Sequence, residues 1–379
     1  MGRTRRWEAD DEGSLEYGPL LTRRRQQMSP GVTVLGRVGP EGPGVFVLYT
    51  GGTIGMVVGP GGGLVPLDLR ELAAHVPVVH ELPVGLTVAT VAKPVDSATM
   101  GVTDWLRIAD TIVEHAAGHL GVVVLHGTDT MAYTASALSF LLEGIDLPVV
   151  LTGSQRPITA VRSDGRENLV TSLELASARV NGGPVVPEVT VFFDHLLLRG
   201  NRAVKVSADS YQGFASPNLP PLVTAGVSFS PTLGLARPPQ VGPVRRVSGL
   251  CSDVAALYLY PGLDRYVLDA VLARPGLRGL VLQAYGAGNG PTEPWFAQAI
   301  AGAVNRDVTV VVTTQCPAGA VRGGLYAAGA AMFDAGAVSA GDMTFEAALT
   351  KLMVALDRHD DPAEVRGLMV RDLAGELTG

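Results

Sequence analysis

Thr53 is the side chain of this sequence best placed to act as a nucleophile. It follows Gly51 and Gly52, after the apolar run Val45–Leu48. Four consecutive apolar residues predict a strand covered on both faces, as in a parallel sheet. The two glycines let the chain turn sharply and let a ligand approach the backbone. Because open α/β sheets bind ligands at the carboxyl ends of their strands, Thr53 is a candidate nucleophile, but this segment alone fits a capping or turn role just as well.

A hydroxyl and a carboxylate follow a second apolar run, Val122–Leu125. Thr128 and Asp129 come after this run and before Ala132–Leu142, a segment without Gly or Pro that predicts a helix. One interpretation is that they only cap this helix. The other is that they lie at a second strand end and face the same crevice as Thr53.

Lys205 is the third candidate, and it lies between Val204 and Val206 beyond an apolar run, Val189–Phe193. Burial would lower the pKa of its amine, and a neighbouring carboxylate would raise that pKa again. A lysine in this balance can exchange protons with a threonine hydroxyl. The alternative is a solvated surface charge, since an isolated lysine is usually exposed. Periodicity alone does not place Lys205 beside Asp129.

Alternating strands and helices must position these side chains. Residues 43–225 alternate apolar runs with three helical segments, Asp104–Ala117, Ala132–Leu142 and Glu167–Arg179. Such alternation predicts a parallel sheet with helices on both faces. The sequence therefore predicts an α/β fold whose larger N-terminal parallel-sheet domain carries the catalytic candidates.

The remaining segments complete the predicted domain organisation. Residues 248–379 alternate again, which predicts a smaller C-terminal α/β domain. The Pro- and Gly-rich segment 226–247 is the expected interdomain linker, and residues 1–42 are expected to be a disordered N-terminal extension. The strands and helices expected in the second domain are Val254–Tyr260, Leu277–Gln283 and Val308–Thr313, and Pro294–Val304, Leu325–Ala335 and Phe345–Asp357.

Composition excludes several classes of protein. The 379 residues are 47% hydrophobic and 17% charged, which is typical of a globular chain with a large core. The net charge of −7 argues against a general nucleic-acid binder. No stretch reaches the roughly 18 apolar residues of a membrane helix, and residues 1–42 contain no apolar signal region. Two cysteines do not indicate a disulfide scaffold, and a cytoplasmic location is expected.

Other polar residues predict no metal or cofactor site. His115 and His119 are spaced i, i+4, but the string EHAAGH lacks the metalloprotease pattern, so a helix surface is the favoured interpretation. Gly61–Gly63 follows no predicted strand and opens no dinucleotide-binding turn. His126 lies between an apolar run and a glycine, and we expect it to be packed and hydrogen-bonded and not to act as a base.

Taken together in chain order, the motifs resemble bacterial L-asparaginase, in particular its cytosolic type I branch. The resemblance covers about Pro43–Gly379 and so involves far more than one short motif. The matching segments are TGGTIG (Thr50–Gly55), HGTDTM (His126–Met131), TGSQRP (Thr152–Pro157), RSDGRENL (Arg162–Leu169), RGNRAVK (Arg199–Lys205), FASPNLPPL (Phe214–Leu222), YPG (Tyr260–Gly262), YGAGNGP (Tyr285–Pro291), TQCPAG (Thr314–Gly319) and GDMTFEAALTKL (Gly341–Leu352).

The resemblance implies a role for each catalytic candidate. Thr53 corresponds to the family's nucleophile, which forms an acyl-enzyme ester with the side-chain amide carbon and releases ammonia. Thr128, Asp129 and Lys205 correspond to a proton relay. No cofactor is implied, because lysine and threonine carry the proton in this family.

The resemblance also implies the substrate contacts. The Asp96–Ser97 pair would hold the α-carboxylate, while Thr128 and Asp129 line the substrate site, with the Asp129 carboxylate binding the α-ammonium by opposite charge. The family forms homo-oligomers, dimers or tetramers, whose active sites lie at subunit interfaces. Asn289, in the turn YGAGNGP, is the candidate for the residue contributed by the neighbouring subunit, and the alternative is an ordinary turn residue.

Three positions depart from the family pattern. Relatives carry a tyrosine about ten residues after the nucleophile, in a flexible lid that closes over the substrate. Here the corresponding segment, Val57–Pro66, contains no hydroxyl, and Leu64 takes the place of the tyrosine. Thr99 replaces an acidic or amide residue of many relatives, and Val204 replaces a threonine that often precedes the lysine. The glycine-rich segment is still expected to be a mobile lid.

The expected function is hydrolysis of L-asparagine to L-aspartate and ammonia through a threonine acyl-enzyme. A dual asparaginase and glutaminase is the nearest alternative, because the same scaffold can hydrolyse glutamine. A catalytically weakened amino-acid-binding protein is the second alternative, suggested by the missing lid tyrosine. The expected partners are the small-molecule substrate and further copies of the chain, with neither nucleic acid nor membrane.

Overall fold

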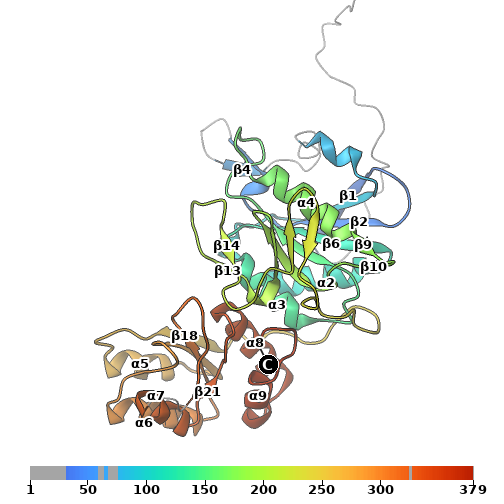
Figure 1. Ribbon diagram of the computed structural model, residues 1–379. Coiled ribbons are helices and arrows are strands. Elements are labelled where there is room, and N and C mark those ends of the chain that lie inside the picture. The colour runs from blue at the N-terminus through green and yellow to red at the C-terminus, as the bar shows by residue number, and fades with distance from the viewer. Residues whose placement is uncertain (1–30, 59–63, 67–75, 324–326, 379) are drawn as a thin grey trace, which may run out of the picture.

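The structure is a computed structural model that describes residues 31–58, 64–66, 76–323 and 327–378. The chain forms two α/β units, and Figure 1 shows the N-terminal unit, in blue to yellow, beside the smaller C-terminal unit, in orange to red. The predicted fold class, a larger parallel-sheet domain followed by a smaller α/β domain, is confirmed.

The first domain is built on a nine-stranded sheet. Five neighbouring strands at its centre run parallel, and the strands outside them pair antiparallel. In spatial order the strands are β1 (Val32–Val38), β5 (Leu86–Val91), β2 (Gly44–Tyr49), β6 (His119–Leu125), β8 (Val149–Thr152), β11 (Val189–Phe193), β12 (Leu196–Arg199), β15 (Val223–Ala225) and β16 (Phe229–Pro231).

Helices cover both faces of this sheet because successive strand side chains point to opposite faces. Phe46 and Leu48 of β2 pack in one apolar cluster with α2 (Val102–Ala116) and α3 (Met131–Leu141). The intervening Val45, Val47 and Tyr49 pack in a second cluster with α4 (Gly165–Ser177). This double burial explains why the central strands are continuous apolar runs.

The second domain contains a four-stranded parallel sheet. Helix α8 lies between the two sheets, and its residues share one apolar cluster with α3 of the first domain and with β19 of the second. The elements are β18 (Val254–Tyr258), β19 (Gly279–Ala284), β20 (Thr309–Thr314), β21 (Val338–Ser339), α5 (Arg265–Leu272), α6 (Pro294–Val304), α7 (Ala327–Asp334), α8 (Phe345–Arg358) and α9 (Pro362–Met369).

The first domain also contains short strands that pair outside the large sheet. Two of them, β13 and β14, form a separate two-stranded sheet, and β13 contains Lys205. The short strands are β3 (Met56–Val58), β4 (Leu64–Pro66), β7 (Leu142–Glu143), β9 (Arg179–Val180), β10 (Gly183–Pro184), β13 (Val204–Lys205), β14 (Phe214–Ala215) and β17 (Arg245–Arg246). In the part of the chain that the structure describes, no helix is both long and apolar enough to cross a membrane.

Two predicted boundaries are corrected by this arrangement. Residues 1–42 were expected to be disordered, but β1 within them pairs antiparallel with β5 at the edge of the large sheet. Residues 226–247 were expected to be a linker, but β16 extends the same sheet and β17 pairs with β7. Strands β1 and β16 are the two outermost strands of the large sheet, where Pro and Gly are tolerated, so composition alone did not reveal them.

Candidate active site

The carboxyl ends of β2 and β6 lie side by side. Tyr49 pairs with Leu125 in the parallel register, so strands β2 and β6 end at the same level of the sheet. Thr50 secures this exit, since its backbone N–H and its side-chain hydroxyl both donate to the Leu125 carbonyl, at 3.0 and 2.9 Å. Thr53 comes four residues after Tyr49, and Thr128 comes three residues after Leu125. Register therefore brings the two predicted hydroxyl positions to one edge of the sheet.

Glycines allow the two loops to pack backbone against backbone. Gly52 has a φ of +94°, and a Cβ there would lie 2.4 Å from the nitrogen of Gly127. A Cβ on Gly127 would in turn lie 2.4 Å from the Ser97 Oγ. Real Cβ atoms do not approach so closely, so both positions need glycine. These contacts hold the loops of Thr53, Thr128 and Ser97 together.

Thr53 opens a short 3₁₀ helix, Thr53–Gly55, and is half-buried. Among the described residues, neither its side chain nor its N–H has a hydrogen-bond partner, and the same holds for the N–H of Thr128. The first N–H groups of a helix have no partner within that helix. Unpaired N–H groups beside a reacting carbonyl are the donors that an oxyanion hole uses.

Tyr49 supports the turn that carries Thr53, and sequence reasoning did not identify it. Its hydroxyl lies 3.2 Å from the carbonyl oxygen of Gly55 and 3.4 Å from that of Gly52, and it donates toward them. Burial raises the pKa of Tyr49 to about 12, so it stays a neutral donor. The only signal in the sequence is an aromatic residue at the end of the strand that precedes the turn.

Lys205 reaches the same edge from the two-stranded sheet formed by β13 and β14. Its Nζ donates to Thr128 Oγ1 at 2.9 Å and to Asp129 Oδ1 at 2.6 Å. The lysine side chain is 19% exposed and the aspartate side chain is 61% exposed. Lys205 is therefore not an isolated surface charge. The structure brings together the lysine, hydroxyl and carboxylate that periodicity could not connect.

Ser97 borders this group from the loop after β5. It begins the 3₁₀ helix Ser97–Thr99, is buried, and its carbonyl accepts a hydrogen bond of 2.8 Å from the Thr130 hydroxyl. Asp96 is exposed, and its carboxylate caps that helix by accepting from the Ala98 N–H at 3.0 Å. Ser97 thus faces the Thr53 and Thr128 loops, while the described contact of Asp96 is structural.

His126 is packed and hydrogen-bonded, as the sequence analysis expected. Its Nδ1 lies 2.6 Å from the Gly127 carbonyl, which can only accept, so this nitrogen carries the proton. Its Nε2 then accepts from the Thr134 hydroxyl at 2.8 Å, and Trp105 Nε1 donates to the same hydroxyl at 2.9 Å. Burial lowers the pKa of His126 to about 4. The ring is neutral at physiological pH and holds the loop before Thr128.

This histidine makes stability depend on pH in a defined direction. Because its pKa is 6.5 when unfolded and about 4 when folded, its contribution is complete above pH 6.5 and is lost as pH falls toward 4. We measure the free energy of unfolding with urea at pH 7 and at pH 4.5. Between these pH values we expect it to fall by about 2–3 kcal/mol more for the wild type than for His126→Asn. His80, which is exposed, provides the control variant His80→Asn. Parallel pH dependences for the wild type and His126→Asn would contradict the assignment.

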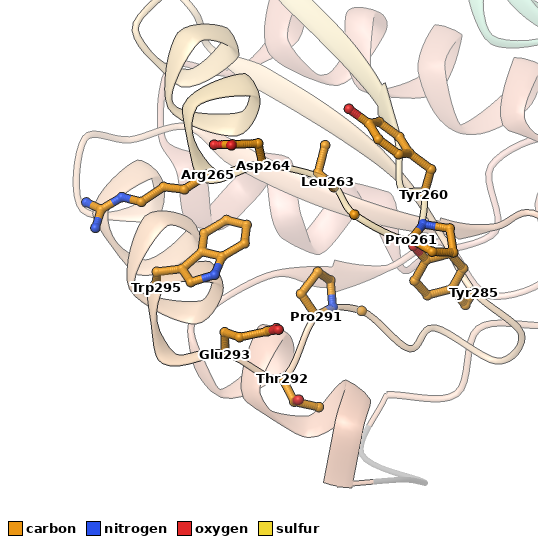
Figure 2. Close-up of a pocket in the computed structure, with 12 residues that line it drawn as sticks. Tyr260, Pro261, Leu263, Asp264, Arg265, Tyr285, Pro291, Thr292, Glu293 and Trp295 are labelled. Carbon is orange, nitrogen blue, oxygen red and sulfur yellow. The ribbon is translucent and has the colours of Figure 1, made fainter.

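Asn289 lies apart from these residues, in the second domain. Its backbone N–H and carbonyl pair with Tyr285 in the turn after β19. Beside this turn is an open cavity of about 590 Å³, and Figure 2 shows Tyr260 and Tyr285 at one end and Trp295 at the other. No described contact joins Asn289 to the Thr53 edge within the protomer.

The predicted lid is only partly within the described residues. Strands β3 and β4 form a hairpin in which Val58 pairs with Leu64. Residues 59–63 and the side chain of Leu64 lie outside the described residues. The expected mobile lid therefore falls on a segment that the structure does not describe.

Within the described ranges, no group of three or more His, Cys, Asp and Glu side chains is placed to hold a metal ion. His115 stacks on Phe46 with ring centroids 4.0 Å apart. His119 contacts the His115 carbonyl through Nδ1 at 2.7 Å and the Thr87 hydroxyl through Nε2 at 3.1 Å. The expected helix surface is wrong, because His115 is buried and His119 lies in strand β6, and packing and hydrogen bonding account for this histidine pair.

The fold and the site define a two-domain α/β protein with hydroxyl, carboxylate and amine side chains at the carboxyl edge of a parallel sheet. Residues 44–232 match the family described as "Asparaginase, N-terminal", and residues 253–369 match the "Glutaminase/Asparaginase C-terminal domain". The chain belongs to the asparaginase family, and the resemblance inferred from the motifs is confirmed.

Individual proteins are similar to most of this chain. The chain is 40% identical to L-asparaginase 1 of Escherichia coli over 88% of this chain and 98% of that protein. It is 42% identical to the 60 kDa lysophospholipase of Mus musculus over 90% of this chain, and it spans 63% of the length of that protein. The structure of L-asparaginase I from Vibrio cholerae superposes with a TM-score of 0.79 at 37% identity, covering 89% of this chain and all of that one.

Proposed function

We propose that this protein is an L-asparaginase that hydrolyses L-asparagine to L-aspartate and ammonia. The observation that carries the proposal is the contact of Lys205 Nζ with both Thr128 Oγ1 and Asp129 Oδ1, at 2.9 and 2.6 Å, on the edge where Thr53 lies. An amide is a poor electrophile and a threonine hydroxyl a weak nucleophile. A site that hydrolyses amides must therefore remove the hydroxyl proton and stabilise the oxyanion.

In the first half-reaction, Thr53 Oγ1 attacks the side-chain amide carbon of the substrate. Its proton passes to the relay of Thr128, Lys205 and Asp129, and the Asp129 carboxylate stabilises the positive charge on the lysine. The tetrahedral oxyanion accepts hydrogen bonds from backbone N–H groups near Thr53 and Thr128. The C–N bond then breaks, the leaving nitrogen takes up a proton from the relay, and ammonia departs from the ester.

In the second half-reaction, water attacks the ester carbonyl carbon. The relay accepts a proton from the water and returns one to Thr53 Oγ1 as the C–O bond of the ester breaks. L-Aspartate leaves and the free hydroxyl is restored, so the enzyme ends the cycle unchanged. The chemistry needs no cofactor, because threonine and lysine side chains supply the nucleophile and the proton transfers.

Charge and position suggest how asparagine is oriented. Asp129 uses one carboxylate oxygen for Lys205 and leaves its exposed side free to bind the substrate α-ammonium. We assign the α-carboxylate to the loop of Asp96 and Ser97, since Ser97 packs against the glycine before Thr128. The cap contact of Asp96 indicates that it orients this loop in addition to the predicted substrate role.

The active assembly is proposed to be a homo-oligomer, a dimer or a tetramer. Asn289 sits in the second domain, apart from the Thr53 edge, so a neighbouring protomer is the natural source of that contact. A cytoplasmic location is proposed as well, because Cys251 and Cys316 are both free thiols, as is usual in a reducing compartment.

Release of ammonia from L-asparagine and L-glutamine, measured in parallel, tests this function. We expect turnover of L-asparagine with kcat of about 1–10³ s⁻¹, the usual range for enzymes. Comparable turnover of L-glutamine would favour the dual amidase. Binding of L-asparagine without ammonia release from either amide, in a folded sample, would contradict the proposal and favour an amino-acid-binding protein.

A further inference from the structure

Strand β13 contains Lys205 and pairs with β14, and residues just before and just after this strand pair bind the second domain. We call β13, β14 and the segment that joins them the lysine hairpin, residues 204–215. Arg202 precedes it and Asn218 follows it, each by a few residues. Both side chains reach one residue of the second domain, Asp342, which lies between β21 and α8.

The attachment before the hairpin is an ion pair within the protein. Arg202 is 1% exposed, and its Nη1 donates to Asp342 Oδ2 at 2.7 Å. Its Nε donates to the Gly375 carbonyl at 2.8 Å. The adjacent Asn201 donates from its side-chain amide to the Ala374 carbonyl at 3.0 Å. The remaining nitrogen, Nη2, donates to Thr378 Oγ1 at 3.4 Å, and a planar guanidinium held at all three nitrogens fixes the backbone from which it extends.

The attachment after the hairpin is a side-chain amide. Asn218 Nδ2 donates to the carbonyls of Asp342 and Gly319, at 2.9 and 3.0 Å. In return the Gly319 N–H donates to Asn218 Oδ1 at 2.8 Å. Asp342 therefore holds one end of the hairpin through its carboxylate and the other through its backbone.

Asp342 is itself held firmly. Its carboxylate accepts from the Thr378 N–H at 2.9 Å and from the Thr378 hydroxyl. Burial by itself raises the pKa of the Asp342 carboxyl. The hydrogen bonds from Thr378 and the charge of Arg202 together lower it by more, so the pKa lies below its ordinary value. The segment that supplies Thr378 is anchored by Lys351 and Glu376, an ion pair of 2.5 Å whose side chains are fully buried.

We propose that Asp342 is a positioning residue for Lys205, and that the second domain sets the position of Lys205 Nζ through Arg202 and Asn218. The inference rests on the proposed function, because it concerns the relay of that reaction. Lys205 must stay within hydrogen-bond reach of both Thr128 and Asp129, and a misplacement of about 1 Å can cost about 10² in rate. Sequence separation hides this link, since Asp342 lies on a different domain.

The test is Asp342→Asn, which keeps the size of the side chain but presents an amide to the Arg202 guanidinium. We expect kcat for L-asparagine to fall by about 10- to 100-fold while KM changes by less than about threefold. Asn218→Ala, which leaves the buried ion pair intact, is the second variant and is expected to lower kcat about tenfold. Circular dichroism and oligomeric state establish that each variant is folded.

Arg237→Gln is the matched control. Arg237 also joins the first domain to the C-terminal segment, through Asp372 at 3.1 Å and the Leu373 carbonyl at 3.1 Å, but it does not touch the lysine hairpin. The Arg237→Gln variant therefore weakens a pair of contacts between the domains, as Asp342→Asn does. We expect its kcat to stay within about twofold of the wild type.

A double-variant cycle separates positioning from general destabilisation. In the Lys205→Met background, Asp342→Asn is expected to lower kcat by no more than about twofold further, because its effect passes through the lysine. An undiminished loss in that background, or normal kcat in both Asp342→Asn and Asn218→Ala, would overturn the positioning role alone. A near-normal rate for Lys205→Met itself would overturn the relay of the proposed function, and the positioning role with it.

Discussion

Thr53→Ala is expected to lower kcat for ammonia release from L-asparagine by about 10⁴-fold or more, since removal of a catalytic nucleophile has effects of this size. The alanine lacks the only group that can form the ester. Its fold should be unaffected, because the Thr53 side chain has no hydrogen-bond partner among the described residues. Steady-state kinetics with coupled ammonia detection measures the loss, and substrate binding by calorimetry should persist.

Thr53→Ser is the matched variant, because it keeps the hydroxyl and removes only a methyl group. It should retain measurable turnover and form an acyl-enzyme detectable by mass spectrometry after rapid quenching. If Thr53→Ala kept more than about a hundredth of the wild-type rate, well above what loss of a nucleophile leaves, another residue would have to be the nucleophile.

Lys205→Met is expected to lower kcat by about 10²–10⁴-fold, the usual contribution of a positioned proton-transfer group. Methionine has a similar length but can neither donate to Thr128 and Asp129 nor carry a proton. The variant also leaves the Asp129 carboxylate without its partner at 2.6 Å, so we expect the pH dependence of kcat/KM to change along with the rate. Both quantities come from kinetics measured across pH.

Lys93→Met provides the control, because Lys93 is exposed and is not among the residues assigned to the site. Its kcat should match that of the wild type within about twofold. A rate for Lys205→Met within about threefold of the wild type would exclude the relay, because positioned proton transfer contributes far more than that.

The sequence predicted much of the fold because the central strands are buried on both faces. The run Val45–Leu48 lies within β2, and Val122–Leu125 lies within β6. Helix α8, Phe345–Arg358, extends the predicted segment Phe345–Asp357 by one residue. Such segments are governed by local patterning. The edge strand β1 escaped prediction because its pairing is interrupted at Gly36 and it lies next to a polar, charged segment.

The site was harder to predict, because its geometry depends on register and on distant contacts. That Thr53 and Thr128 come off adjacent strands follows from the pairing of Tyr49 with Leu125, which no single strand encodes. Lys205 meets Asp129 only because the lysine hairpin folds back across the edge of the sheet. The contacts of Asp342 with Arg202 and Asn218 connect residues more than a hundred positions apart, where periodicity carries no information.

The three lysines of this chain differ sharply in access, which matters for chemical conjugation. Lys93 is exposed, Lys351 is fully enclosed by its ion pair, and Lys205 is 19% exposed. Among lysine side chains, an amine-reactive polymer or support therefore meets Lys93 first and cannot reach Lys351 in the folded protein. Reaction at Lys205 would remove the donor to Thr128. Lys93 is therefore the lysine to use for attachment and Lys205 the one to protect, and binding of L-aspartate at the Thr53 edge during coupling would shield Lys205.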